Sequence, residues 1–199
     1  VSETMWYLVN IFVRSGIKEI QGDIVVDDTL FDQARYDESR QKERVDRAYD
    51  APTGAMSFNW NSVNIFVRPG EKVGDSARVW ADPENDYIDL QSKVKTGKSG
   101  SKNTVVADRD QKKLGDLLQV TGSIPLGSKE IVIYKNITRP DLWAGSNLKA
   151  FLKQRGITVS GGVQSGKAPS NVWTVAEAES KPIEAILADM NKFSNNYVA

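Results

Sequence analysis

The sequence predicts an α+β fold in which helix-strand units at both ends of the chain enclose a nested β-rich insertion. Helical periodicity is found near both ends, whereas residues 75–134 contain short β-like runs separated by turn residues. The stretch "GIKEIQGDIV" at 16–25 is echoed by "GITVSGGV" at 156–163. Each copy reads as a helix stop, a short spacer, a glycine and a strand. We therefore expect two similarly built units that share one sheet.

The first unit begins with a helix over residues 3–15, because apolar residues recur there at helical spacing (Met5, Leu8, Val9 and Phe12). Gly16 can adopt the left-handed conformation that ends a helix. Residues 24–26 are predicted to form a strand. Residues 35–50 are dense in charge and poor in apolar side chains, which is typical of an exposed loop.

A strand is predicted over residues 58–68, where apolar residues alternate and Pro69-Gly70 follows. The β-like runs after it are "ARVW", "YIDL", "NTVVA", "LLQVTGSI" and "EIVIY". Pro140 opens a second long helix that ends at Gly156. Residues 160–171 are rich in Gly and Ser and are predicted to be a loop. A last helix has Pro182 in its first turn, and its apolar residues predict a buried face: Ile183, Ile186, Leu187, Met190 and Phe193.

Composition excludes several classes of function. The chain has 199 residues, 40% of them hydrophobic, which is enough to bury a core. Lys plus Arg and Asp plus Glu both number 26, so net charge gives no reason to expect nucleic acid or an anionic membrane as a partner. No apolar run approaches the ~20 residues that a membrane span needs.

The absence of cysteine and histidine narrows the chemistry further. Disulfides, thiol nucleophiles, cysteine-ligated metals and a Ser-His-Asp triad are all excluded. Any nucleophilic catalysis has to use Ser or Thr, with Lys, Tyr or a carboxylate as the base. We expect no metal and no cofactor.

Three short strings are similar to the S-x-x-K, K-T-G and S-x-N motifs of penicillin-recognising serine enzymes: "SGIK" at 15–18, "KTG" at 95–97 and "SNN" at 194–196. The first cannot work, because Ser and Lys must share a helical face and Gly16 ends the helix between Ser15 and Lys18. The "KTG" string lies in a basic, Gly- and Ser-rich stretch and is predicted to be a solvated loop. By itself "SNN" is typical of a helix end.

The string "GGVQSGKA" at 161–168 imitates a phosphate-binding loop. Ala168 replaces the Ser or Thr that binds Mg²⁺, and no clear helix follows. We therefore reject a nucleotide site here.

The wider sequence resembles one family in order and spacing. The matching runs are "GIKEIQGDIVVDDTLFD", "YDAPTGAMSFNWNSVNIFVRPG", "NTVVADRD", "VTGSIP", "LKQRGITVSGGV" and "SKPIEAILADMNKFSNN". They are similar to the D-alanyl-D-alanine carboxypeptidases/endopeptidases among the class C low-molecular-mass penicillin-binding proteins. In that family two extra domains split the peptidase domain, between S-x-x-K and S-x-N.

The resemblance implies that this chain is an internal fragment. Residues 1–74 and 135–178 would form the first extra domain, residues 75–134 a nested β-rich domain, and residues 179–199 a helix of the split peptidase domain. The nucleophilic serine and its general-base lysine would lie outside this chain. K-T-G should follow S-x-N, so "KTG" at 95–97 is in the wrong order.

By resemblance, Ser194 would relay a proton between the catalytic lysine and the leaving amine, and Asn196 would bind the lysine and the substrate. The implied activity is serine acyl transfer on D-Ala-D-Ala or related bonds of peptidoglycan peptides. β-Lactams would be covalent inhibitors, and the protein would be exported to the bacterial cell envelope. The fragment alone should be inactive.

The alternative is a non-catalytic module that binds the cell wall or docks a partner. Its only indication is a set of aromatic residues that could be exposed: Trp80, Tyr87, Trp143 and Trp173. Most of these should instead take part in packing.

Overall fold

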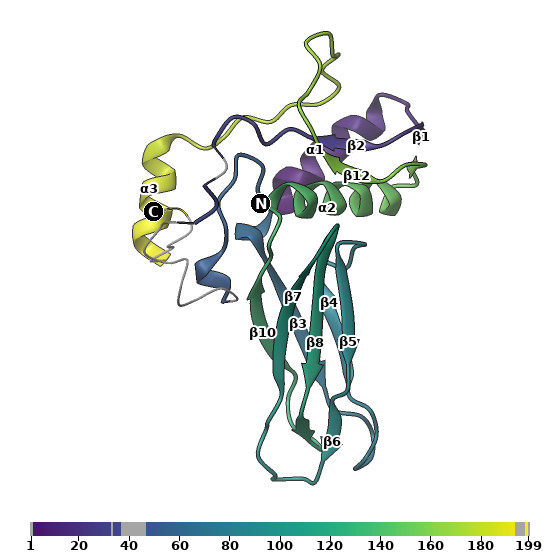
Figure 1. The fold of residues 1–199 in the computed structure, drawn as a ribbon, viewed down its shortest axis with the longest axis vertical. Helices are drawn as coiled ribbons and strands as arrows, with labels where there is room; N and C mark the ends of the chain where they lie inside the picture. The colour runs from purple at the N-terminus through teal and green to yellow at the C-terminus, as the bar shows by residue number, and fades with distance from the viewer. Residues whose placement is uncertain (1, 33, 37–46, 194–197, 199) are drawn as a thin grey trace.

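The structure, a computed structural model, describes residues 2–32, 34–36, 47–193 and 198 (Figure 1). Two long helices and four short strands form one end of an elongated molecule, and a long β body extends from them. The last helix lies beside this helical end. The predicted α+β class is confirmed.

The helical end is built from the two predicted helix-strand units. The first contains α1 (Ser2–Arg14), β1 (Glu19–Ile20) and β2 (Ile24–Val26), and the second contains α2 (Pro140–Gln154), β11 (Thr158–Val159) and β12 (Val163–Ser165). Gly16 and Gly156, with φ of 84° and 75°, follow the two helices in the left-handed region.

Equivalent strands of the two units pair in parallel, as the sequence echo suggested. Glu19 of β1 lies opposite Thr158 of β11, and Ile24 of β2 lies opposite Val163 of β12. The pairs form two separate two-stranded ladders, so the expectation of one shared sheet is wrong. The predicted loop over residues 160–171 is also corrected, because β12 lies within it and pairs with β2.

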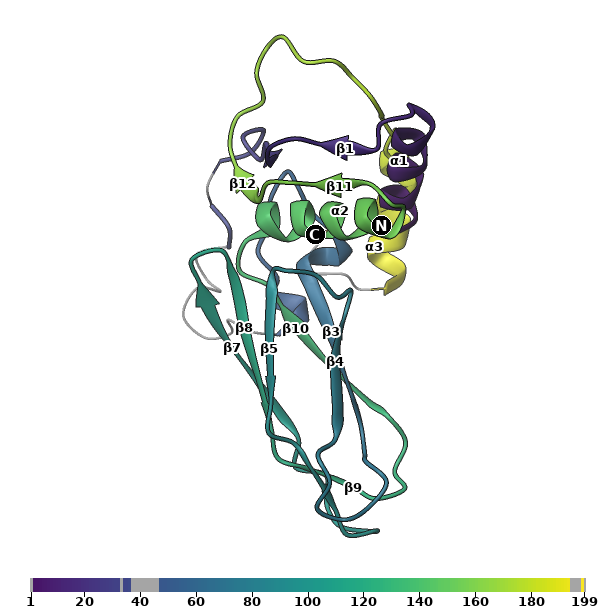
Figure 2. The same cartoon turned by 90° about the vertical axis from the view of Figure 1, so that its right-hand side faces the viewer.

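The β body consists of two three-stranded sheets and one two-stranded ladder. One sheet has the order β10-β3-β4 and is antiparallel, and the other has the order β5-β8-β7. A parallel pair, β6-β9, lies at the end far from the helices (Figures 1 and 2). The bounds of these strands are β3 (Ser62–Arg68), β4 (Arg78–Asp82), β5 (Ile88–Ser92), β6 (Lys95–Gly97), β7 (Val106–Lys112), β8 (Gly115–Thr121), β9 (Ser123–Pro125) and β10 (Ile131–Asn136).

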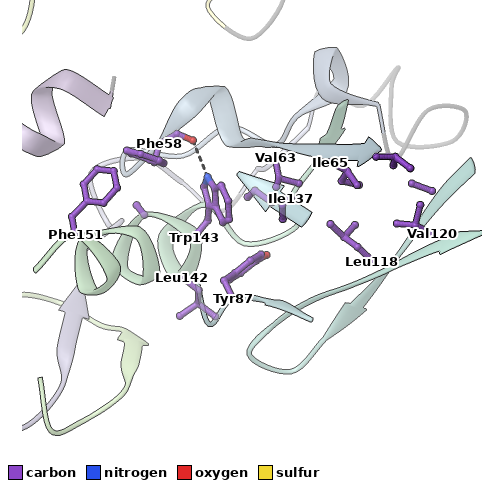
Figure 3. Packing of buried hydrophobic residues seen from close by; sticks show 14 of the residues in the cluster. Phe58, Val63, Ile65, Tyr87, Leu118, Val120, Ile137, Leu142, Trp143 and Phe151 are labelled. Carbon is purple, nitrogen blue, oxygen red and sulfur yellow. Dashed lines mark hydrogen bonds between the residues drawn. The ribbon is translucent and has the colours of Figure 1, made fainter. Parts of the chain in front are cut away.

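One hydrophobic core joins the β body to the helical end. Alternate residues of β3 (Val63, Ile65 and Val67) are buried, as their spacing predicts. Figure 3 shows Val63 and Ile65 on the side of β3 that faces Leu118 and Val120 of β8. Trp143 of α2 is fully buried at the junction. Its indole Nε1 donates a hydrogen bond of 2.9 Å to the Phe58 carbonyl oxygen.

Two short 3₁₀ turns precede the β body, η1 (Ala48–Asp50) and η2 (Asn59–Asn61). The exposed loop predicted for residues 35–50 falls mainly on residues 37–46, outside the described residues; within its described part, Asp50 is buried. None of the described helices is long and apolar enough to cross a membrane.

Candidate functional site

The helix that leads to the predicted S-x-N motif is present. α3 (Ile183–Phe193) begins directly after Pro182, whose carbonyl oxygen accepts hydrogen bonds from the amides of Ala185 and Ile186. Ser194 and Asn196 follow the helix in sequence and lie outside the described residues. Their roles therefore remain predictions.

The apolar face of α3 is not covered by the described part of this chain. The Ile183 side chain is 69% exposed and Leu187 is 45% exposed, while Ile186 and Met190 are half-buried. No described side chain of α3 belongs to the hydrophobic core. The prediction of a buried face is thus wrong for the chain by itself, although the sequence pattern of an amphipathic helix is present.

The "SGIK" string is not an active site. The Ser15 hydroxyl donates a 2.7 Å hydrogen bond to the Phe12 carbonyl oxygen at the helix end. Gly16 then turns the backbone, and Lys18 lies in an extended segment whose carbonyl accepts a bond from the Thr158 amide. The helix ends between Ser15 and Lys18, as expected.

The prediction that the "KTG" string is a solvated loop is wrong, because Lys95–Gly97 form strand β6. Thr96 is only 2% exposed, and its hydroxyl oxygen accepts a 2.8 Å hydrogen bond from the Gly70 amide. Lys95 Nζ donates to the Ser76 hydroxyl. The threonine is thus a buried structural residue at the far end of the β body.

In the loop that imitates a phosphate site, two backbone amides donate hydrogen bonds to carboxylates of the chain itself. Gly162 N donates to Asp23 Oδ1 at 2.6 Å, and Ala168 N donates to Asp27 Oδ2 at 2.8 Å. The bond from Ala168, followed by those from Thr29, lowers the pKa of Asp27 to about 2. Carboxylates of the chain thus take the place of an anion.

A large groove lies where the helical end meets the β body. Its volume is about 1050 Å³, and it is lined by Asp82 of β4 and the loop after it, by α2 and by β11. Figure 2 shows α2 lying across the ends of β4 and β5. Sequence reasoning missed this groove, because its sides come from segments about 70 residues apart in the chain.

A strained turn borders the groove at Asn59. Three consecutive non-glycine residues, Asn59, Trp60 and Asn61, have φ values of 48°, 51° and 52°. Such left-handed conformations cost energy in residues with a side chain. The buried Asn61 side chain stabilises the turn by donating to the Pro52 carbonyl oxygen and accepting from the Phe58 amide.

The four aromatic residues of the alternative hypothesis have different surroundings. Tyr87 and Trp143 are buried and pack edge-on against each other. Trp80 is half-buried and stacks on Phe66, with ring centroids 5.3 Å apart. Trp173 is 93% exposed. The expectation that most of the four take part in packing is confirmed.

A buried polar cluster connects β8 to the start of α2. Asp116 accepts hydrogen bonds from the Tyr87 hydroxyl at 3.1 Å, the Thr138 amide at 2.9 Å and the Thr138 hydroxyl at 2.5 Å. Burial raises the pKa of Asp116, opposed by the bonds from Thr138, and burial also raises the pKa of Tyr87. The Asp116 carboxylate is thus hydrogen-bonded to neighbouring groups of the protein, which indicates a structural role.

Comparison with known proteins adds a family relationship. The sequence profile of the D-Ala-D-Ala carboxypeptidase 3 (S13) family matches residues 2–199. The D-alanyl-D-alanine carboxypeptidase of Actinomadura sp. (strain R39) is 31% identical over 193 residues, which cover 92% of this chain and 35% of that protein. This chain thus spans about a third of the length of that curated relative.

Solved structures show the same fold. Penicillin binding protein 4 (dacB) from Haemophilus influenzae matches with a TM-score of 0.75 and 20% identity, over 98% of this chain and 43% of that one. A second structure of that protein, complexed with a β-lactam, matches with a TM-score of 0.65 and 19% identity, over 99% and 41% of the two chains.

Proposed function

This chain belongs to the D-Ala-D-Ala carboxypeptidase 3 (S13) family, and we propose that it is the insertion region of a longer penicillin-binding serine DD-peptidase. The observation that carries this proposal is the family match over residues 2–199, which includes α3 and the Ser-Asn-Asn that follows it. The 35% coverage of the Actinomadura carboxypeptidase supports a longer parent protein.

The uncovered apolar face of α3 also supports a larger assembly. An amphipathic helix gains stability by burying its apolar stripe against another element. Ile183 and Leu187 are exposed because no described residue of this chain covers them. In the proposed parent, the remainder of the peptidase domain covers this face and holds α3 beside the nucleophile.

The proposed chemistry is acyl transfer at a D-Ala-D-Ala or related peptide bond of peptidoglycan. A serine outside this chain attacks the carbonyl carbon, an acyl-enzyme forms, and water hydrolyses the ester. Ser194 passes the proton from the catalytic lysine to the leaving amine, and Asn196 binds the lysine and the substrate amide. β-Lactams acylate the same serine.

This assignment has consequences for location and for the isolated chain. Action on peptidoglycan places the parent in the bacterial cell envelope, outside the cytoplasm. Without nucleophile or general base, the 199-residue chain is inactive. The division into residues 1–74 with 135–178, residues 75–134 and residues 179–199 stays a prediction.

Fluorescent penicillin tests the assignment. The full parent should be labelled on a serine outside this chain, and the 199-residue chain should not be labelled. In the parent, Ser194→Ala should slow acylation by about 10²-fold or more, as expected for loss of a proton-transfer group. Ser180→Ala, an exposed serine just before α3, is the matched control and should label normally. A folded parent that takes up no label would contradict the assignment.

A further inference from the structure

The groove between the β body and α2 is a formed cavity with a defined boundary. The loop after β4 is fixed to α2, because Asn85 Nδ2 donates to Asn147 Oδ1 at 3.1 Å and Asn85 Oδ1 accepts from the Tyr87 amide at 2.9 Å. At one end, the Ser2 hydroxyl donates to Asn59 Oδ1 at 3.1 Å. The boundary is therefore preorganised, which lowers the entropic cost of binding a ligand.

Charges of opposite sign line this groove. Asp82, Glu84 and Asp86 come from the end of β4 and the loop after it, and all three are exposed. Lys149 and Lys153 come from α2, where they are four residues apart and therefore on one face of the helix.

These opposite charges are not joined in ion pairs within the described part of the chain. None of the ion pairs between described residues joins one of the three carboxylates to either lysine. Lys149 Nζ instead donates to the Gly161 carbonyl oxygen at 2.8 Å, which fixes the position of its ammonium group. The groove therefore presents an anionic side and a cationic side to the same cavity.

Aromatic side chains also line the groove. Trp6 lines the groove, with its ring stacked on that of Phe151 at a centroid distance of 4.7 Å. Trp80 also contributes to the lining. The volume of about 1050 Å³ is slightly above the range of about 300–1,000 Å³ for small-molecule sites, so the groove has room for a short peptide.

We propose that this groove binds a zwitterionic peptide segment. An ammonium group of the ligand faces Asp82, Glu84 and Asp86, a ligand carboxylate faces Lys149 and Lys153, and the carbon chain between them lies against Trp6. A polyanion is repelled by the carboxylates, and a purely apolar ligand offers no opposite charge to the carboxylates or to the lysines. None of the residues lining the groove belongs to α3, and the inference does not depend on the proposed peptidase activity.

The test is a titration of the 199-residue chain with L-Lys-D-Ala-D-Ala, which has two amines and one carboxylate. Calorimetry or tryptophan fluorescence should show saturable binding that weakens as salt is added. Acetylation of both amines of the same peptide should weaken binding about tenfold or more, because the ammonium groups are removed while the carboxylate stays.

Exposed groove residues provide variants with little risk to the fold. The double variant Glu84→Gln/Asp86→Asn should weaken the free peptide and leave the weaker acetylated peptide unchanged. Lys153→Ala should weaken both peptides. The matched control Asp108→Asn/Lys129→Ala changes exposed charges elsewhere on the β body and should bind like the unaltered chain.

The proposal would be overturned if the peptide showed no saturable binding up to about 10 mM, a concentration above the dissociation constants of specific ligand sites. It would also be overturned if the free and acetylated peptides bound with equal affinity, or if the control variant lost as much affinity as the groove variants. Penicillin labelling of the parent is a separate measurement, so failure of the groove proposal and failure of the peptidase assignment are distinguishable.

Discussion

The helices α2 and α3 share sequence features but differ in burial: α2 is largely buried, whereas α3 is largely exposed. Both have proline at or just before their first residue and carry a stripe of apolar residues. All residues from Pro140 to Asn147 of α2 are buried, including the polar residues Asp141, Ser146 and Asn147. In α3 no described side chain is buried. Amphipathic pattern therefore predicts that a helix has a partner, and only the structure shows whether the partner belongs to this chain.

Two features fix the position of the buried helix α2. Gly145 lets the helix approach the strands closely, because a Cβ there would lie 2.5 Å from Val163 Cγ1 and 2.6 Å from Val26 Cγ2. The buried Asp141 carboxylate accepts hydrogen bonds from the Arg139 guanidinium at 2.6 and 3.0 Å. α2 is thus packed closely against β2 and β12.

The largest expected effect is that of Trp143→Ala on α2. This change removes a fully buried indole and its hydrogen bond to Phe58, and should lower the free energy of unfolding by about 3–5 kcal/mol. Urea denaturation measures the loss. Trp173→Ala removes the same side chain from an exposed position and should change stability by less than ~0.5 kcal/mol. Equal effects at both sites would contradict the position of the core.

Next in size is the effect of Asp116→Asn in the buried cluster beneath α2. The carboxylate accepts three hydrogen bonds, and an amide nitrogen at one of its oxygen positions would face donors instead. We expect a loss of about 1–3 kcal/mol in the free energy of unfolding. Asp110→Asn, an exposed residue of the neighbouring strand β7, should have little effect. A loss no larger than that of the control would show that the cluster is not structural.

A smaller, pH-dependent effect is expected at Asp27, which connects the two helix-strand units. Its folded-state pKa of about 2 lies below the ordinary value of about 3.9. The contribution to stability is therefore complete above about pH 4 and is lost as pH falls toward about 2. The urea midpoints of the unaltered chain and Asp27→Asn should differ at pH 6 and converge near pH 2. A difference that persists at pH 2 would exclude the carboxylate as its source.

The smallest effect in this chain is expected for Leu187→Gln on α3. Leu187 is exposed and glutamine has a similar helix propensity, so the free energy of unfolding should change by no more than ~0.5 kcal/mol. In the longer parent the same change should cost about 1–3 kcal/mol, because a polar group is then buried. Leu152→Gln on α2 is the control and should destabilise the 199-residue chain itself. A parent that is insensitive to Leu187→Gln would show that α3 stays uncovered.

Local sequence patterns predicted much of the fold. Alternation in residues 58–68 predicted the buried face of β3, although the strand begins only at Ser62, after the turn η2. The recurrence of Gly16 and Gly156 after helices indicated two similar units. The strand Lys95–Gly97 could not be found in this way, because it is only three residues long and contains no apolar residue that could alternate with polar ones. Thr96 is its one buried residue. Its assignment depends on pairing with β9, which lies far from it in sequence.

The groove was beyond sequence reasoning for a similar reason. Asp82, Glu84 and Asp86 look like solvated loop residues, and Lys149 and Lys153 look like the polar face of a helix. Only the packing of α2 across the ends of β4 and β5 brings the two groups to one cavity.

The sequence by itself determined the α+β class, the two helix-strand units, the exclusion of cysteine and histidine chemistry, and the family. These follow from residue types and short-range spacing, which are properties of the chain before it folds. The tertiary structure alone decided which amphipathic faces are covered, that the "KTG" threonine is buried, and that opposite charges meet in one groove unpaired. These depend on contacts between distant segments, and such contacts are set by the packing of the whole molecule.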